Sequence, residues 1–312
     1  MLTLQKSDLN VFTHEGFSLS DLRISVDHDT CARFPFIGYG QPHAQQLRAH
    51  GQISFHVSPS GSDSNNDCLT QETPCQTIQY AVARVMGDWD FAWRGDPFIR
   101  LGPGTYSEGA VLTGQPVGAH TINIVGQQDS DPDQSCALAQ AEQVVIRGAP
   151  GRPVFYIQDL AIGVVRCLTF EGTDSVAFFC RQTPASDIAF VKLGNSQSLA
   201  GGIQANENCG VNLAGTIWLG ANIDDFLCSD RISRITVGGG TSITALGNIQ
   251  MTHFALSYQQ SLLEFRSGVS VVGPISTKYG SLVWRGGAII TNGLKLPGGV
   301  AQATPNAPGF ID

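Results

Sequence analysis

Short apolar runs recur along most of the chain and are separated by polar, glycine-containing segments. Their centres fall at Ile99, Ile122, Val144, Val165, Ile188, Val211 and Ile235. Runs this short are typical of buried strands, and a nearly constant interval of about 20 residues or more is typical of a solenoid. The pattern therefore predicts an all-β chain whose strands stack turn upon turn.

The carboxyl-terminal part of the pattern is tighter. Further apolar runs near Phe254, Val271 and Ile289 follow at shorter intervals, which predicts last turns that are smaller or more triangular. Glycines between the runs mark expected corners, because a positive φ costs glycine least. These corners are Gly126, Gly148, Gly172, Gly194 with Asn195, and the run from Gly238 to Gly240.

One segment near the amino-terminal side changes from strand to helix periodicity. The apolar residues Ile78, Ala81, Val82 and Val85 fall at helical spacing, and Thr77 can cap the helix or occupy its first turn. A helix with one apolar face must bury that face. The open end of a coil would provide such a surface, although one helix in an ordinary α+β domain would fit the same residues.

Two stretches around this helix carry a resemblance to a known family. Phe55-His-Val-Ser-Pro-Ser-Gly-Ser-Asp is followed by Thr-Pro-Cys-Gln-Thr-Ile and then by Ile99-Arg-Leu-Gly-Pro-Gly-Thr-Tyr-Ser-Glu108. This order resembles the opening of right-handed parallel β-helix proteins of the pectate-lyase-like type. The resemblance implies a right-handed parallel β-helix, a single-stranded solenoid with a short amino-terminal capping helix.

The carboxyl end adds a second resemblance. Leu-Pro-Gly-Gly followed by Thr-Pro-x-x-Pro-Gly is similar to the ending of β-helix proteins encoded by prophages of soil bacteria. Those proteins are virion components, commonly homotrimers packed along the helix axis. The resemblance therefore implies a phage or prophage tail spike or a related fibre.

The chain divides into four predicted regions. Residues 1–50 lack the repeat but contain several aromatic residues, so they form either a cap on the same chain or a segment that attaches to another protein. Residues 51–96 comprise an entry strand, a turn and the capping helix, and residues 97–290 form the β-helix body. Residues 291–312 are rich in proline, glycine and alanine and are expected to form an extended strap along this or a neighbouring subunit.

Composition and charge exclude several classes of partner. Charged residues make up only 14% of the chain, as expected for a β-rich, turn-rich protein, and the net charge is −8. A negative protein has no electrostatic attraction for nucleic acid or anionic membranes. Asp8 and Asn10 interrupt the apolar run that a signal peptide would need, and no segment predicts membrane insertion. These features predict a protein made in the host cytoplasm without a signal peptide, and the resemblance to the prophage proteins implies that its place is the virion.

The eight cysteines are scattered and include no Cys-x-x-Cys pair. Most are expected to be small buried apolar residues. Cys68 and Cys75 bracket one turn and could form a bridge, but a reducing cytoplasm favours free thiols unless the protein leaves the cell. The redox state of this pair stays open at the level of sequence.

Carboxylates are the candidate catalytic groups, because β-helix enzymes that cleave polysaccharides generally use two or three acids on one exposed face. Glu207 lies shortly before Val211 and Asp230 shortly before Ile235, so these two acids could stack on adjacent turns. Solvent-exposed corner acids are the competing interpretation, and the sequence leaves open whether the protein is a polysaccharide hydrolase or lyase. The other acids considered are Asp159, Glu171, Asp174, Asp187, Asp224, Asp225 and Glu264.

No metal or cofactor is predicted. The acids of Asp129-Ser-Asp-Pro-Asp133 alternate as in a calcium loop, but Gln134 and Gln140 stand where the loop needs glycine and glutamate. Asp63, Asn65 and Asp67 could gather around a cation or could cap the backbone of their own turn.

The functional hypothesis is a virion structural protein that binds a bacterial surface polysaccharide. It would form a homotrimer and would contact other virion proteins through residues 1–50. Its candidate glycan-binding residues are Trp218, Tyr258, Tyr279 and Trp284, each of which could instead pack in the core or a trimer interface. The alternatives are a polysaccharide depolymerase or lyase, and a purely structural virion or adhesin module.

Overall fold

The computed structural model describes residues 47–48, 53–91, 95–114, 116, 119, 121–126, 135–160, 162–184, 186–302 and 310–311. Residues 44–312 form one compact unit, separate from residues 1–43. The segment predicted as a cap or attachment region, residues 1–50, lies outside the described residues except for 47–48.

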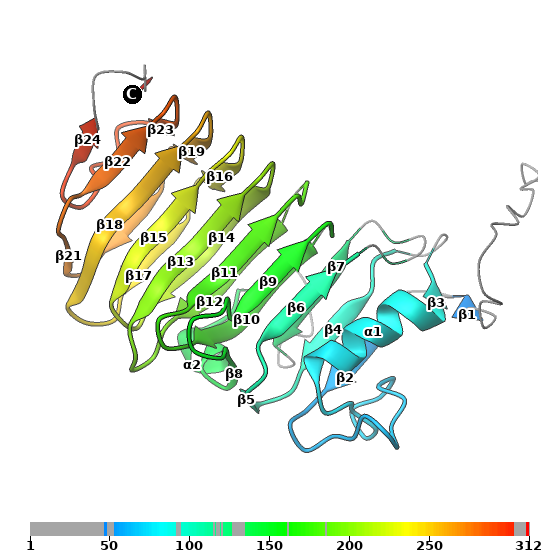
Figure 1. The fold of residues 1–312 in the computed structure, drawn as a ribbon. Coiled ribbons are helices and arrows are strands. Elements are labelled where there is room, and N and C mark those ends of the chain that lie inside the picture. Colours follow the sequence, from blue (N-terminus) through cyan, green and yellow to red (C-terminus); the bar gives the residue numbers. More distant parts are fainter. Residues whose placement is uncertain are drawn as a thin grey trace, which may run out of the picture. The chain divides into compact units, whose positions relative to one another are not determined.

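Within residues 44–312 the strands form a parallel β-solenoid of about seven turns with very little helix (Figure 1). The predicted fold class, a right-handed parallel β-helix, is confirmed. All strand pairs of the described residues are parallel, as a coil with one hand of crossover requires.

A fourteen-stranded sheet supplies two of the three faces of each turn. β14 shows how, because its first half pairs with β16 and its second half pairs with β17. The strands of this sheet are β2 (Ser54–Val57), β4 (Phe98–Leu101), β5 (Gly104–Tyr106), β7 (Ile122–Gly126), β8 (Val144–Arg147), β10 (Ile162–Glu171), β12 (Ser186–Leu193), β14 (Gly210–Leu219), β16 (Arg234–Val237), β17 (Ser242–Ala245), β19 (Leu262–Phe265), β20 (Ser270–Val272), β23 (Ala288–Ile290) and β25 (Phe310–Ile311).

A nine-stranded sheet supplies the third face. Its strands are β6 (Ala110–Thr113), β9 (Phe155–Gln158), β11 (Val176–Arg181), β13 (Leu199–Asn206), β15 (Ile223–Ser229), β18 (Ile249–Tyr258), β21 (Ile275–Thr277), β22 (Ser281–Trp284) and β24 (Val300–Gln302). β1 (Leu47–Arg48) pairs with β3 (Trp89–Asp90), and the helices are α1 (Ile78–Asp88) and α2 (Leu138–Ala141).

One continuous hydrophobic core runs through the coil, from Phe55 to Leu296. Aromatic side chains stack in it along the axis. The Phe178 ring lies 5.7 Å from the Phe155 ring and 6.5 Å from the Phe170 ring, between ring centroids. Because each turn buries its inward side chains only against its neighbours, the turns stabilise one another.

The helix α1 confirms the expected amino-terminal cap. Its four predicted apolar residues are buried in the core of the coil, and Thr77 Oγ1 accepts a hydrogen bond from the Tyr80 amide at 3.1 Å. Glu108, from the Pro-Gly-Thr-Tyr-Ser-Glu motif, also caps the helix, because its Oε1 accepts from the Ile78 amide at 2.9 Å. The two stretches that carry the family resemblance therefore meet at the amino terminus of α1.

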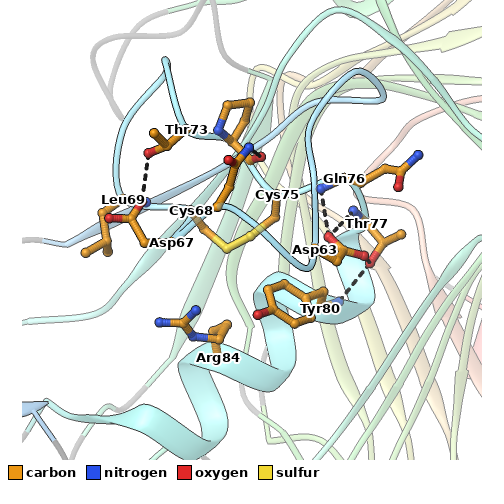
Figure 2. The surroundings of a disulfide bond; sticks show 12 residues. Asp63, Asp67, Cys68, Leu69, Thr73, Cys75, Gln76, Thr77, Tyr80 and Arg84 are labelled. Carbon is orange, nitrogen blue, oxygen red and sulfur yellow. Dashed lines mark hydrogen bonds between the residues drawn. A yellow bond between two sulfur atoms is a disulfide. The ribbon is translucent and has the colours of Figure 1, made fainter.

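The acids of the polar turn before α1 accept hydrogen bonds from its own backbone and hydroxyl groups (Figure 2). Asp63 accepts hydrogen bonds from the Gln76 and Thr77 amides and from the Thr77 hydroxyl. Asp67 accepts from the Leu69 amide at 3.0 Å and from a threonine hydroxyl. The backbone-capping interpretation of these acids is the one that the hydrogen bonds support.

The repeat was predicted correctly as a tendency but not turn by turn. Val144 does not continue the column of Ile99, because Ile99 pairs with Ile124, and Ile124 pairs with Val165. The intervening turn is longer since it contains α2, and Val144 lies on β8, on another face.

The prediction of smaller last turns is wrong. The three apolar runs behind it lie on β18, β20 and β23, on different faces of the coil, at Phe254, Val271 and Ile289. Their spacing therefore measures the distance between faces rather than the length of a turn. In the strand register Arg234 pairs with Leu262, and Leu262 pairs with Ala288. Both steps are longer than the preceding one, from Gly210 to Arg234.

The corner glycines behave differently from one another. Gly194 and Gly240 have positive φ, as predicted, whereas Gly126, Gly148 and Gly172 do not. At Gly126 the requirement is space, because a Cβ atom would lie 2.3 Å from the Cys167 carbonyl oxygen. Several corners instead carry non-glycine residues in the left-handed region, which the sequence pattern did not indicate.

Three disulfides overturn the prediction that most cysteines are unbridged. Cys68 is bonded to Cys75, Cys136 to Cys167, and Cys180 to Cys209. The last two pairs are 31 and 29 residues apart in sequence, so only the stacking of the coil brings them together. Among the cysteines that the structure describes, Cys228 alone is free.

The carboxyl-terminal segment adds strands to both sheets. β24 pairs with β22 and β25 pairs with β23, so parts of the predicted strap over residues 291–312 lie along this chain's own coil. Leu296 lies between β23 and β24 in the sequence and packs in the hydrophobic core.

Candidate functional site

Two aromatic clusters lie on the outer face of the nine-stranded sheet, towards its carboxyl-terminal end. In the first, Tyr258 and Trp284 occupy paired positions at the ends of β18 and β22, with ring centroids 5.7 Å apart. The Trp284 side chain is 40% exposed, and the Arg285 guanidinium lies over its ring at 4.6 Å from the centroid. An exposed tryptophan held by a neighbouring cation is a preformed flat platform.

The second cluster lies farther back along β18. The His253 ring is 5.4 Å from the ring of Tyr279, which is 55% exposed, and Lys278 Nζ lies 4.8 Å from the centroid of the Tyr279 ring. His253 Nδ1 and Asp225 Oδ1 form a hydrogen bond of 2.8 Å across neighbouring turns. The carboxylate thereby orients the imidazole and leaves Nε2 for another partner.

We call the set Asp225, His253, Tyr258, Tyr279 and Trp284 the aromatic surface. Its two clusters are separated along β18 by the span from His253 to Tyr258, which corresponds to roughly 15 Å at the rise of a strand. Sugar rings present apolar C–H faces that pack on aromatic rings, and exposed apolar groups bordered by polar side chains mark binding surfaces. The aromatic surface is long enough for several consecutive sugar units.

A hollow adjoins this surface at the corner where the nine-stranded sheet turns into the next strand. Its volume is about 330 Å³, and we call it the corner hollow. Three successive corners of the coil line it, with residues Arg231, Ile232, Gln259, Gln260 and Arg285.

The backbone at these corners lies in the left-handed region. The φ values are 50° at Arg231, 64° at Ile232, 47° at Gln259, 63° at Gln260 and 50° at Arg285. Placing a side chain there costs about 1–2 kcal/mol for each residue relative to glycine. Hydrogen bonds between turns hold the arrangement, including Ile232 N–H to the Gln259 carbonyl at 3.2 Å.

The predicted catalytic acid Glu207 is engaged in two ion pairs, with Arg181 and Arg231. The hydrogen bond from Arg181, with the positive charge of both arginines, lowers the pKa of Glu207 below its usual value. Such a carboxylate does not hold the proton that a general acid must donate. Glu207 therefore links Arg181 and Arg231 through ion pairs along the corner of the coil.

Asp230 lies beside the aromatic surface. Ser229 pairs with Ser257, so the residues that follow, Asp230 and Tyr258, are neighbours on adjacent turns. The Asp230 carboxylate accepts a hydrogen bond of 2.8 Å from the Arg231 amide. Glu207 and Asp230 are thus on adjacent turns, as predicted, but both contact Arg231.

Two weakly acidic groups on this face stay protonated at neutral pH. Burial, with the nearby charges of Asp225 and Asp230, raises the pKa of the Cys228 thiol to about 12. Burial likewise raises the pKa of the Tyr258 hydroxyl to about 12. The thiol is therefore unreactive, and the phenol is a hydrogen-bond donor.

Trp218 does not belong to the aromatic surface. Its side chain is 9% exposed and packs in a small cluster with Cys136, Ala141 and Cys167, beside Leu138 of α2. Of the four aromatic candidates, the fold thus brings Tyr258, Tyr279 and Trp284 to one face and buries the fourth.

Sequence reasoning missed the Asp225–His253 pair and the arginines of the corner hollow. In the sequence Asp225 is one acid among several, and His253 has no second histidine at helical spacing. The two residues lie one turn of the coil apart and pair in register between β15 and β18. The sequence signal that could have identified the pair is the separation of Asp225 and His253, which equals the length of one turn of the coil.

Other sites are weaker. Among the described residues no group of three or more histidines, cysteines or acids is placed to hold a metal ion, and neither described helix is long and apolar enough to cross a membrane. A second hollow is lined by Glu142, Val145, Thr169, Lys192 and Asn195. Its buried Lys192 already pairs with Glu142 at 2.6 Å.

Comparison of the chain with protein-family models, with curated proteins and with solved structures finds no match. The functional argument therefore rests on the residues of the site.

Proposed function

We propose that this protein is a glycan-binding β-helix protein of the tail-spike type, which contacts a bacterial surface polysaccharide through the aromatic surface. The observation that carries the proposal is the pair of exposed aromatic clusters on one sheet face. A rigid coil holds both clusters in register, so a polysaccharide can contact them together without ordering a loop.

The polar groups between and beside the clusters suit the same ligand. Sugar hydroxyls both donate and accept hydrogen bonds, and this face offers carboxylate acceptors at Asp225 and Asp230 and donors at Tyr258 and Arg285. Clefts that bind polar ligands combine aromatic contact with a few oriented polar groups.

The disulfides support a protein that acts outside the cell. Disulfides persist in oxidising surroundings and are rare in a reducing cytoplasm. Three bridges are present, two of them between segments about one turn apart in the coil. A virion released from its host meets this condition.

The proposal includes a homotrimer attached to other virion proteins through residues 1–50, and detection of the chain in purified virions tests that part.

The test of glycan binding is Trp284→Ala. We expect at least a tenfold loss of affinity, because truncating an aromatic anchor at the centre of a contact typically costs about 1–2 kcal/mol or more. Binding is measured by biolayer interferometry on capsules and O-antigens that the unchanged protein binds. Val272→Ala is the control, since Val272 is exposed on β20, in the other sheet.

Two results would contradict the proposal. One is the absence of binding to any polysaccharide of a broad bacterial panel, and the other is a Trp284→Ala protein that binds as tightly as the unchanged chain. The urea midpoint of each variant verifies that its fold is intact.

Glycan cleavage is a second candidate function, and the Asp225–His253 hydrogen bond favours it. An imidazole oriented by a carboxylate can act as a general base. For a polysaccharide that binds and is cleaved, we expect His253→Gln to reduce the release of reducing ends or unsaturated sugars by about 100-fold or more. Glu207→Gln is the matched control and should retain the rate. No release from a bound polysaccharide, or equal loss in both variants, removes this candidate.

A further inference from the structure

We infer that the corner hollow binds the carboxylate of an acidic sugar unit, a uronic acid, in the polysaccharide that crosses the aromatic surface. The inference rests on the proposed glycan-binding function and specifies the class of ligand. It follows from the charge, the hydrogen-bonding groups and the position of the hollow.

The charged side chains that line the hollow are arginines. Two of the five lining residues are arginines and none is an acid, in a chain whose net charge is −8. Because Glu207 and Asp230 lie beside Arg231, the charge that can attract an anion to the hollow is that of Arg285.

The two arginines are not equivalent. Arg231 is neutralised by Glu207 and lies 3.8 Å from a carboxylate oxygen of Asp230, atom to atom. Arg285 makes no ion pair with any residue that the structure describes, and its contact is with the Trp284 ring. Its planar guanidinium therefore keeps its hydrogen-bond donors for a ligand, and a carboxylate matches them in a bidentate geometry.

Two amides stand beside the guanidinium. The backbone of Gln259 bonds to neighbouring turns, and no side-chain hydrogen bond joins Gln259 or Gln260 to another described residue. Each amide offers two donors and an acceptor, which suit the carboxylate and the neighbouring hydroxyls of a sugar acid. Ile232, 66% exposed, supplies an apolar contact for the C–H face of the ring.

The position of the hollow connects it to the aromatic surface. Trp284 precedes Arg285 directly, and the guanidinium lies over its ring. A sugar unit on Trp284 thus places the next unit of the same chain at the hollow. The neutral unit contacts the Trp284 ring and the acidic unit contacts the Arg285 guanidinium. The protein thus recognises two successive sugar units of the polymer.

The test compares matched acidic and neutral sugars. Sodium glucuronate and galacturonate, and glucose and galactose, are titrated at millimolar concentration and detected by saturation-transfer NMR. We expect the uronates to bind at least about tenfold more tightly than the neutral sugars, because a charge-assisted hydrogen bond is worth about 1.5–3 kcal/mol. Arg285→Gln should abolish this preference, so that uronates bind no more tightly than the matched neutral sugars. Arg266→Gln, at an exposed arginine beyond β19, should preserve it.

A polymer arm repeats the comparison with polygalacturonate, its carboxyl-reduced form and dextran sulfate. The inference is overturned if wild-type protein does not prefer uronates, if Arg285→Gln retains the preference, or if dextran sulfate binds as tightly as polygalacturonate, which would indicate general anion binding. These failures leave neutral-glycan binding at Trp284 intact. Failure of the proposed function instead removes the binding of every sugar.

Discussion

Phe178→Ala is expected to lower the free energy of unfolding by about 3–5 kcal/mol, because it opens a cavity in the centre of the coil. Phe178 is fully buried, and its ring packs against those of Phe155 and Phe170. Neighbouring turns cannot collapse into the space without breaking their parallel hydrogen bonds. Urea unfolding followed by circular dichroism measures the change in midpoint and slope.

Phe179→Ala is the matched control at the next residue. Phe179 has the same side chain but points outwards, where its ring stacks on Tyr156 at 5.6 Å. Its replacement should cost about 1 kcal/mol, the value of one exposed aromatic pair. Equal losses in the two variants would show that the assigned inward and outward faces of β11 are wrong.

Replacing both Cys180 and Cys209 by serine is expected to lower the free energy of unfolding by about 3–4 kcal/mol, the loop-closure entropy of a bridge of this size. The bridge joins residues 29 apart, from β11 to the residue before β14 on the following turn. Without it the unfolded chain gains conformational freedom, while the folded coil keeps its strand pairing. Thermal unfolding under non-reducing conditions provides the comparison.

Cys228→Ala controls for the loss of a buried sulfur that makes no bridge. It should change stability by about 1 kcal/mol or less, as expected for one small substitution outside the hydrophobic core. Peptide mapping of the unreduced protein tests the pairing directly. A map that lacks the peptide linking Cys180 to Cys209 would contradict the assigned bridge, whatever the stability of the variants.

The local elements were predictable because their causes are local. Thr77 and the apolar residues that follow it specify a capped, one-sided helix through bonds and spacings within about one helical turn. The Pro-Gly-Thr-Tyr motif also acts over short range at one end, since the Tyr106 hydroxyl contacts the Gly102 carbonyl at 2.9 Å. Its second contact, with the Val57 carbonyl, joins residues far apart in the sequence and needed the fold.

The candidate site was only partly predictable. Tyr258, Tyr279 and Trp284 were identified as aromatic side chains with a possible glycan role, and the fold brings them to one face. The same criterion selected Trp218, which α2 covers, because sequence does not say where a short helix will lie. The partner of His253 lies one turn away, and the residues that line the hollow with Arg285 come from three successive corners, so residue type alone could not identify either group.

The sequence by itself determined that this chain is a coil of parallel strands with a helix at its entry, because the length of the apolar runs and their approximate interval are properties of the chain. The tertiary structure decided which residues stack, since turns differ in length and a shift of one residue exchanges the two faces of a strand. The Cys136–Cys167 and Cys180–Cys209 disulfides, the Asp225–His253 pair and the corner hollow all depend on that register. Each brings together side chains from neighbouring turns, whose distance in space is set by strand pairing rather than by their separation along the chain.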